Sequence, residues 1–516
     1  MIKKLNRTLK KSEDNLSFTE NGALGYKSHY EELTTLNFMI PTLRRIDTEG
    51  ANKIMFPAYF EDPSVFCRWL FFLRDCRGGI GEKNAFKKMF IALSNKKEKL
   101  AKRFVEFIPE FGSWKDVVDI YFDYTLKSQV VRDELKHLIC DRFSTDLEIV
   151  SGQSDKKFQG QDISLLAKWL PSVNAGNKSR NEALQLCKEV LLISPADYRK
   201  SVAQMRRYIE VLEQKLCARE FDAVEYDKIP SIAGLRYKNT FIRHDEKRYK
   251  EFISSVAKGE KKINVSQVQP QDIYSKYKYN FYVDDAFEEM WKALPKKVKD
   301  SDSTLVICDG SGSMLSSVSG SICALDVSNS LAIYFSEQLK GEFKDKFITF
   351  SSQPQLIDLS ECKTLYDKIS VMESHYDCSN TNLYKTFRLI LNTAIEHSLK
   401  QEELPKNLLI ISDMEFDWIA TDNDQKILFD KIGEEFAKAG YDLPKLIFWN
   451  VNSRTNIIPI LENKNGVILV SGYSTAICDT VCSIENDPYQ AILRAVNVER
   501  YDAFEQSYNN YISSSH

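Results

Sequence analysis

The sequence has few of the features that mark special classes of protein. It contains only 20 glycines and 14 prolines in 516 residues, which excludes collagen-like and proline-rich chains. Its 11 cysteines include no Cys-x-x-Cys pair and there are six histidines, so we expect neither zinc fingers nor a disulfide framework. No run approaches the ~18 apolar residues that cross a membrane, and the basic start lacks a signal-peptide core. We therefore expect a soluble, cytoplasmic protein with reduced thiols and no membrane partner.

An excess of charge of one sign is also absent. The chain carries 70 lysines and arginines against 73 acidic residues, a formal net charge of −3. A surface that binds nucleic acid must therefore be a local patch. The apolar fraction of 43% is typical of folded domains and excludes a mostly disordered chain. Because one core rarely grows past about 250–300 residues, the length indicates roughly two to four domains.

The first part of the chain has helical periodicity. Apolar residues recur at three- and four-residue spacing, as at Phe66, Trp69 and Leu73. Turns that contain glycine interrupt this period and separate the helices. Short helices in series favour an all-α domain of HEAT-like repeats over residues 30–298. We expect residues 1–29 to form a flexible N-terminal segment.

The pattern changes near residue 299. Five short, mainly apolar runs of strand length alternate with stretches of helical character. Strands of this kind are buried on both faces, and their alternation with helices is typical of a parallel sheet. We predict a doubly wound α/β domain over residues 299–485, followed by C-terminal helices over 486–516 that pack back on the helical domain. The five runs are 304–308, 347–350, 408–411, 446–449 and 467–470.

Oxygen-bearing side chains follow the predicted strands. Asp309, Ser311 and Ser313 come directly after the first strand, Asp413 ends another strand, and Thr381 precedes a predicted helix. Ligands bind at the carboxyl ends of strands in open parallel sheets, and Mg²⁺ and Mn²⁺ prefer oxygen ligands. The first three residues alone could equally form a serine- and glycine-rich turn that caps a helix. Together the five residues predict a site for Mg²⁺ or Mn²⁺.

Motifs for catalysis are not recognisable. The loop at 310–314 is not the Gly-x-Ser-x-Gly of a nucleophile elbow, and the glycine turn at 78–83 lacks the spacing of a phosphate-binding loop. A carboxylate pair of Asp413 and Asp417, with Glu415 between them, has no evident histidine or cysteine partner. A metal-dependent hydrolase would also need a water-activating base that we cannot locate. We therefore expect no catalytic residue and no enzymatic activity.

Basic residues cluster in the helical part. Several recur at spacings of three, four and seven, which places them on one helical face. With nearby tyrosines, such a face can follow a phosphate backbone and stack on bases. Acidic residues interleave with the cluster, so an ordinary solvated face is the alternative. The candidate RNA-binding residues are Arg74, Arg77, Lys83, Lys168, Lys178, Arg180, Arg199, Arg206, Arg207, Arg243, His244 and Lys247.

The predicted metal ligands resemble a known site. The Asp-x-Ser-x-Ser motif that starts at Asp309, with Thr381 and Asp413, resembles the metal-ion-dependent adhesion site of von Willebrand factor A domains. This resemblance implies a Rossmann-like fold. It also implies an open metal position that an acidic side chain of a partner protein fills. The glycine that often precedes the threonine in that family is Asn380 here.

Helical repeats followed by such a domain resemble the Ro ribonucleoprotein (TROVE) family. Residues 73–83 and 163–172 resemble more closely an uncharacterised Ro-like family of unknown function. The resemblance implies that the chain binds structured or misfolded noncoding RNA on its helical repeats. The alternative is a protein-interaction scaffold that uses the metal site to capture a partner carboxylate, without RNA.

Overall fold

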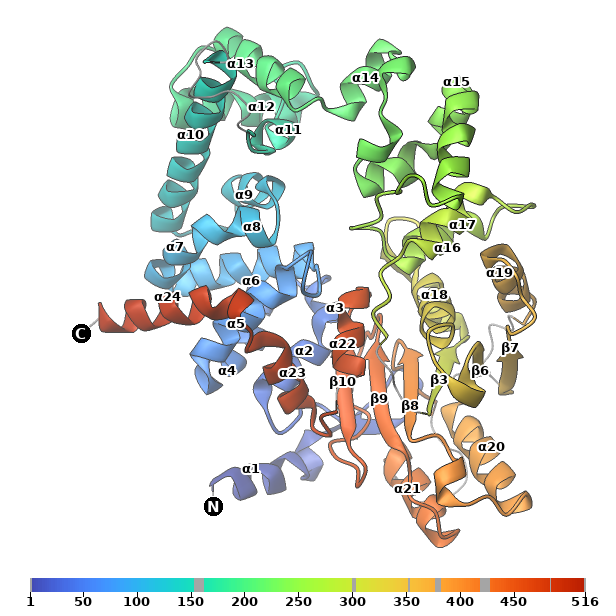
Figure 1. Cartoon of the computed structure of the whole chain (residues 1–516). Coiled ribbons are helices and arrows are strands. Elements are labelled where there is room, and N and C mark those ends of the chain that lie inside the picture. The colour runs from blue at the N-terminus through green and yellow to red at the C-terminus, as the bar shows by residue number, and fades with distance from the viewer. Residues whose placement is uncertain are drawn as a thin grey trace.

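The structure is a computed structural model with a helical half followed by a mixed α/β half (Figure 1). This order confirms the change of pattern that we predicted near residue 299. None of the helices in the described part of the chain combines the length and the apolar composition of a membrane span. The structure describes residues 2–152, 162–298, 303–350, 353–375, 382–417, 427–482 and 484–514.

The helical half rises from the sheet, turns over and returns to it. In Figure 1 helices α4 to α13 climb one side, α14 lies at the top, and α15 to α17 descend to α18 beside the sheet. Local signals start these helices: Asp62 caps α5 by accepting from Val65 N at 3.0 Å, and Pro63 occupies the first turn. The helices are α2 (Glu32–Phe38), α3 (Ile40–Leu43), α4 (Thr48–Glu61), α5 (Pro63–Arg74), α6 (Lys83–Lys96), α7 (Glu98–Phe104), α8 (Ile108–Phe111), α9 (Trp114–Tyr121), α10 (Gln129–Ser151), α11 (Leu166–Trp169), α12 (Asn177–Gln185), α13 (Pro195–Tyr208), α14 (Leu212–Ala218), α15 (Ser231–Ala257), α16 (Pro270–Tyr277) and α17 (Asp285–Lys292).

The α/β half is built on a six-stranded sheet with the order β10-β9-β8-β3-β6-β7. All neighbouring strands are parallel except β7, which runs antiparallel to β6 at the edge. Each of the five predicted apolar runs is a strand. The sequence did not indicate β7, because an edge strand has no continuous apolar run. The strands are β3 (Thr304–Asp309), β6 (Lys346–Phe350), β7 (Gln355–Asp358), β8 (Asn407–Ser412), β9 (Lys445–Asn450) and β10 (Val467–Ser471).

Both faces of the sheet are covered. Alternate residues of one strand enter different cores: Val306 packs with α18 (Ala324–Ser336) and the helical half, whereas Ile307 packs with α20 (Leu383–Glu396) and α21 (Leu428–Lys438). From β3 the chain continues to β6 on one side and later returns to β8 on the other. The direction of winding therefore reverses between β3 and β8.

The N-terminal segment differs from the flexible one that we expected. Residues 1–29 contain α1 (Ile2–Lys10) and a hairpin of β1 (Leu16–Phe18) and β2 (Leu24–Tyr26). Tyr26 exchanges two backbone hydrogen bonds with Ile458, of 2.9 and 2.8 Å. Strands of three residues are too short to show a period in sequence, and their stability comes from this long-range pairing.

The C-terminal helices pack on the helical half. α23 (Pro488–Val496) and α24 (Asp502–Ser513) lie against α5, and α24 also contacts α7 (Figure 1). Phe504 of α24 is fully buried and stacks on Phe71 of α5 with ring centroids 3.9 Å apart. The end of the chain thus contributes to the core of its beginning.

Candidate metal centre

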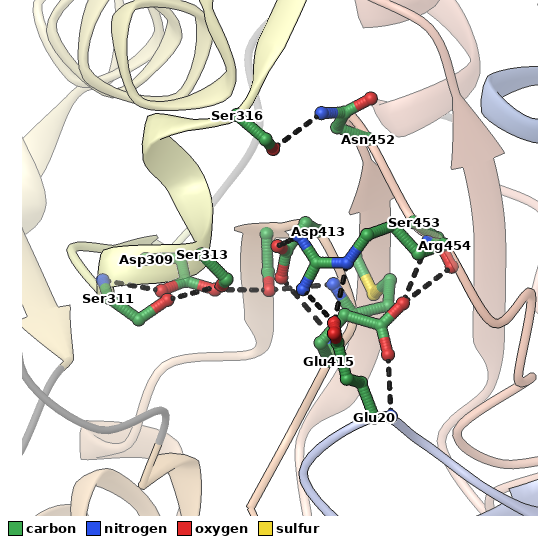
Figure 2. Close-up of polar contacts among 12 residues, drawn as sticks. Glu20, Asp309, Ser311, Ser313, Ser316, Asp413, Glu415, Asn452, Ser453 and Arg454 are labelled. Atoms are coloured by element: carbon green, nitrogen blue, oxygen red, sulfur yellow. Dashed lines mark hydrogen bonds and ion pairs between the residues drawn. The ribbon is translucent and has the colours of Figure 1, made fainter.

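The candidate metal ligands meet at one edge of the sheet. Asp309 is the last residue of β3, and Asp413 directly follows the last residue of β8. These strands are parallel neighbours, so their carboxyl ends lie side by side (Figure 2). This is also the point where the winding of the sheet reverses, which is where open α/β sheets bind their ligands.

The loop after β3 turns around the carboxylate of Asp309. Its Oδ1 accepts a hydrogen bond from Ser311 N at 2.9 Å, and its Oδ2 accepts one from the Ser412 hydroxyl. The hydroxyl oxygens of Ser311 and Ser313 lie 3.0 Å apart. Asp309 and Ser311 are buried, whereas Ser313 is partly exposed. One carboxylate and two hydroxyls therefore share a small, mostly buried space.

Burial of the two carboxylates, Asp309 and Asp413, disfavours their charged forms. Burial and the nearby charge of Asp413 raise the pKa of Asp309 to about 7. Burial also raises the pKa of Asp413, whose Oδ2 has no hydrogen-bond partner among the described residues. A buried carboxylate oxygen without a donor is costly, and a bound cation would remove that cost.

The oxygen set suits a hard divalent cation. Asp309, Asp413 and the hydroxyls of Ser311 and Ser313 are all oxygen donors of the kind that Mg²⁺ and Mn²⁺ prefer. In the described ranges, no three His, Cys, Asp or Glu side chains gather into a metal-binding group, so this site depends on its serines. Thr381 lies outside the described residues. The following helix α20 starts with Asn382 as its N-cap, whose side chain accepts from Lys385 N at 3.1 Å.

Glu415 is a buried carboxylate next to the site, and both of its oxygens already accept hydrogen bonds from the protein. It accepts from the N–H groups of Arg454, Thr455 and Glu20 at 2.7, 2.9 and 2.9 Å, and from the Thr455 hydroxyl at 2.8 Å. This carboxylate ties the loop after β9 and the N-terminal segment to the end of β8. It therefore has a structural role, which no local sequence pattern indicated because its partners come from distant segments.

A cavity of about 590 Å³ lies where the two halves meet. Its lining includes the glycine turn before α6, the start of α16, the β4–β5 hairpin (Ser317–Ser319 and Ile322–Cys323) and the segments that follow β9 and β10. The Asn452 amide donates to the Ser316 hydroxyl at 2.9 Å, which joins the cavity wall to the loop of the candidate metal site (Figure 2).

Two candidate RNA-binding residues have structural roles instead. Arg74 is 1% exposed and donates from Nη2 to Asp116 Oδ2 at 2.6 Å. Arg206 donates to the carbonyl oxygens of Ala167 and Leu170 at 2.8 and 2.7 Å, which joins α13 to α11. We correct both assignments, because charge clustering in sequence does not show which guanidinium groups face the interior.

Two further candidates, Lys168 and His244, are only partly available for contact with RNA. Lys168 is half-buried, with its ammonium nitrogen 4.0 Å from Glu213. His244 is exposed but stacks on Phe221 with ring centroids 4.7 Å apart. The other candidates are exposed, namely Arg77, Lys83, Lys178, Arg180, Arg199, Arg207, Arg243 and Lys247.

Seven of the eight exposed candidates fall into two groups, and the eighth, Lys178, lies 3.8 Å from Glu182. Arg77 and Lys83 flank the glycine turn, and Lys83 lines the cavity between the halves. The second group is carried by α12, α13 and α15, three helices in the upper part of the molecule in Figure 1: Arg180 in α12, Arg199 and Arg207 in α13, and Arg243 and Lys247 in α15. None of these last five has an ion-pair partner within the described ranges, so their charges remain available to a ligand.

Comparisons with known proteins assign no activity to the chain. A model of a domain of unknown function (DUF7788) matches residues 303–499, and a second one (DUF2828) matches residues 178–306. "Uncharacterized protein L728" of Acanthamoeba polyphaga mimivirus is 26% identical over 512 residues, which cover 93% of this chain and 87% of the relative. The crystal structure of the Deinococcus radiodurans Ro (RSR) protein is 13% identical, covers 86% of this chain and 93% of its own, and has a TM-score of 0.34. A TM-score this low does not establish a shared fold.

Proposed function

We propose that this protein binds noncoding RNA through its helical half and holds a divalent cation in its α/β half. The observation that carries the metal assignment is the pair of buried carboxylates, Asp309 and Asp413, on neighbouring strand ends. Both carboxyl groups have raised pKa values, and Asp413 Oδ2 accepts no hydrogen bond from the described residues and has only Arg454 Nη1 nearby, at 3.7 Å. Mg²⁺ or Mn²⁺ supplies that charge, with Ser311, Ser313 and Thr381 as further oxygen ligands.

The α/β half is, in this proposal, a von Willebrand factor A domain. Counted in chain order, its strands follow the doubly wound sequence 3-2-1-4-5-6, with the short third strand antiparallel at the edge. The Asp-x-Ser-x-Ser motif follows the first of these strands, and Asp413 follows the fourth. An open position on the metal then accepts the carboxylate of a partner protein.

The helical half is proposed as a HEAT-like array of the Ro type. The support for RNA is a set of exposed cations on α12, α13 and α15 that have no acidic partner in the described part of the chain, namely Arg180, Arg199, Arg207, Arg243 and Lys247. Lysine and arginine side chains of this kind bind the phosphate groups of RNA, and such contacts depend little on the base sequence. The role is binding rather than catalysis, in the cytoplasm, in the folding, quality control or storage of RNA.

Two measurements on the full chain test the two halves of the proposal separately. Mg²⁺ binding by calorimetry should be present in the wild type and lost in Asp309→Ala. Filter binding of a structured RNA should survive Asp309→Ala and be lost in the double variant Arg199→Glu with Arg207→Glu. Lys115→Glu is a matched control, because Lys115 already pairs with Asp119 at 2.7 Å.

The outcomes distinguish the alternatives. Metal binding without any RNA binding would favour the scaffold that captures a partner carboxylate. Degradation of the RNA in the presence of Mg²⁺ would show an enzyme instead of a binding protein. An absorbance ratio at 260 and 280 nm that is typical of pure protein would count against tightly bound cellular RNA.

A further inference from the structure

Arg454 lies between the candidate metal site and the N-terminal segment. Its Nη1 is 3.7 Å from Asp413 Oδ2, the carboxylate oxygen that has no hydrogen-bond partner among the described residues. Its Nε donates to Glu20 Oε2 at 2.6 Å, and its Nη2 contacts the same carboxylate (Figure 2). The guanidinium is therefore bonded to Glu20 and only close to Asp413.

The position of Glu20 is set by its own backbone. The hydroxyl of Thr19 donates to Phe416 O at 2.7 Å, and Glu20 N donates to Glu415 at 2.9 Å. The backbone N–H of Arg454 donates to the same buried carboxylate of Glu415 at 2.7 Å. Glu415 thus holds both partners of the ion pair in place beside the site.

We propose that Arg454 and Glu20 together set the affinity of the site for its divalent cation. This inference rests on the proposed metal site. The positive charge of Arg454 repels a divalent ion on Asp413 and competes for its free oxygen. Glu20 opposes both effects, because it neutralises the guanidinium and holds it away from Asp413. The N-terminal segment would then control a site that lies almost 300 residues later in the chain.

The two side chains are placed to adjust the metal affinity of the site rather than to stabilise the fold. The side chain of Arg454 is 29% exposed and that of Glu20 is 55% exposed. Exposed ion pairs of this kind contribute little to stability, so neutral variants should fold normally. Their charges would still act on a divalent ion at Asp413, because that ion would carry two charges and lie next to a buried carboxylate.

The decisive result is that the two single variants change the affinity for the ion in opposite directions. Binding of Mn²⁺ to the full chain is measured by electron paramagnetic resonance, and binding of Mg²⁺ by calorimetry. Arg454→Gln should bind either ion about fivefold more tightly, and Glu20→Gln should bind it about threefold more weakly, which are changes of about 1 kcal/mol or less. The double variant should fall between the two, and Arg454→Lys should stay near the wild type.

A second ion pair of the N-terminal segment provides the control. Lys11 lies 2.5 Å from Glu462, and neither residue belongs to the candidate site. Lys11→Gln and Glu462→Gln should leave the affinity for both ions unchanged. Circular dichroism checks that every variant is folded.

Two failures are distinguishable. If Arg454→Gln binds the ions as the wild type does or more weakly, or if Glu20→Gln shifts affinity in the same direction, the tuning role is overturned and the metal site stands. If the wild type binds neither ion in a way that depends on Asp309, the metal site itself is wrong and the inference falls with it.

Discussion

The guanidinium of Arg74 donates from Nη2 to Asp116 Oδ2 at 2.6 Å, with both residues buried between α5 and α9. Loss of one member of a buried ion pair leaves the other charge unpaired, which costs about 3–5 kcal/mol. We therefore expect Arg74→Met to lower the free energy of unfolding by this amount, measured by urea denaturation. Folded variant protein should bind RNA as the wild type does. A loss of RNA binding without a loss of stability would contradict the structural role.

The stability of the metal-free protein should fall as pH rises towards neutrality. The pKa of Asp309 is raised from 3.8 to about 7, so the folded state holds a proton that the unfolded chain has lost between these values. Stability then decreases with pH across this window, by at most about 1.4 kcal/mol per pH unit. Melting temperatures in EDTA between pH 4.5 and 7.5 measure the slope.

Two comparisons check the cause of this pH dependence. Asp309→Asn should flatten the curve, because the amide has no proton to lose. Mg²⁺ should stabilise the wild type most at the upper end of the range, where both carboxylates are charged. An unchanged slope in Asp309→Asn would assign the effect to other groups.

RNA affinity should depend steeply on salt if the exposed cations contact phosphates. Each phosphate contact to a single strand contributes a slope of about −0.7 in a plot of log affinity against log salt concentration. Replacing Arg243 and Lys247 with glutamine should make the slope shallower by roughly 0.7 to 1.4, the contribution of one to two phosphate contacts. Fluorescence anisotropy from 50 to 300 mM KCl measures it, and an identical slope in this variant would remove α15 from the RNA-binding surface.

The N-terminal hairpin should be sensitive to a single methyl group. A Cβ at Gly25 would come within 2.3 Å of a side-chain carbon of Ile457 and 2.8 Å of Ile458 O, closer than real contacts allow. Gly25→Ala should therefore separate β2 from the loop after β9 and increase hydrogen exchange in residues 13–30. Gly259→Ala serves as the comparison for adding a methyl group in open space, with some backbone strain from its φ of +75°. Unchanged exchange in Gly25→Ala would show that the contact between β2 and the loop after β9 accommodates the methyl group.

The sheet could be predicted from the sequence because its central strands are buried on both faces. A strand such as β8 needs apolar residues on both of its faces, and this produces the continuous run 408–411 without any long-range information. The strand ends then place Asp309 and Asp413 on one edge, since parallel neighbours share their direction. The N-terminal hairpin could not be predicted in this way, because its short strands pair with distant residues.

Sequence by itself determined the succession of helices, the buried strands and the oxygen-rich loop at Asp309, because periodicity and spacing are local properties of the chain. Only the tertiary structure decided which charges are available. It buried Arg74 against Asp116, tied Arg206 to backbone carbonyls, and brought Glu20 to Arg454 beside Asp413. The partners in these contacts lie between 39 and 434 residues apart in the chain, so no local pattern records which charges are buried or paired.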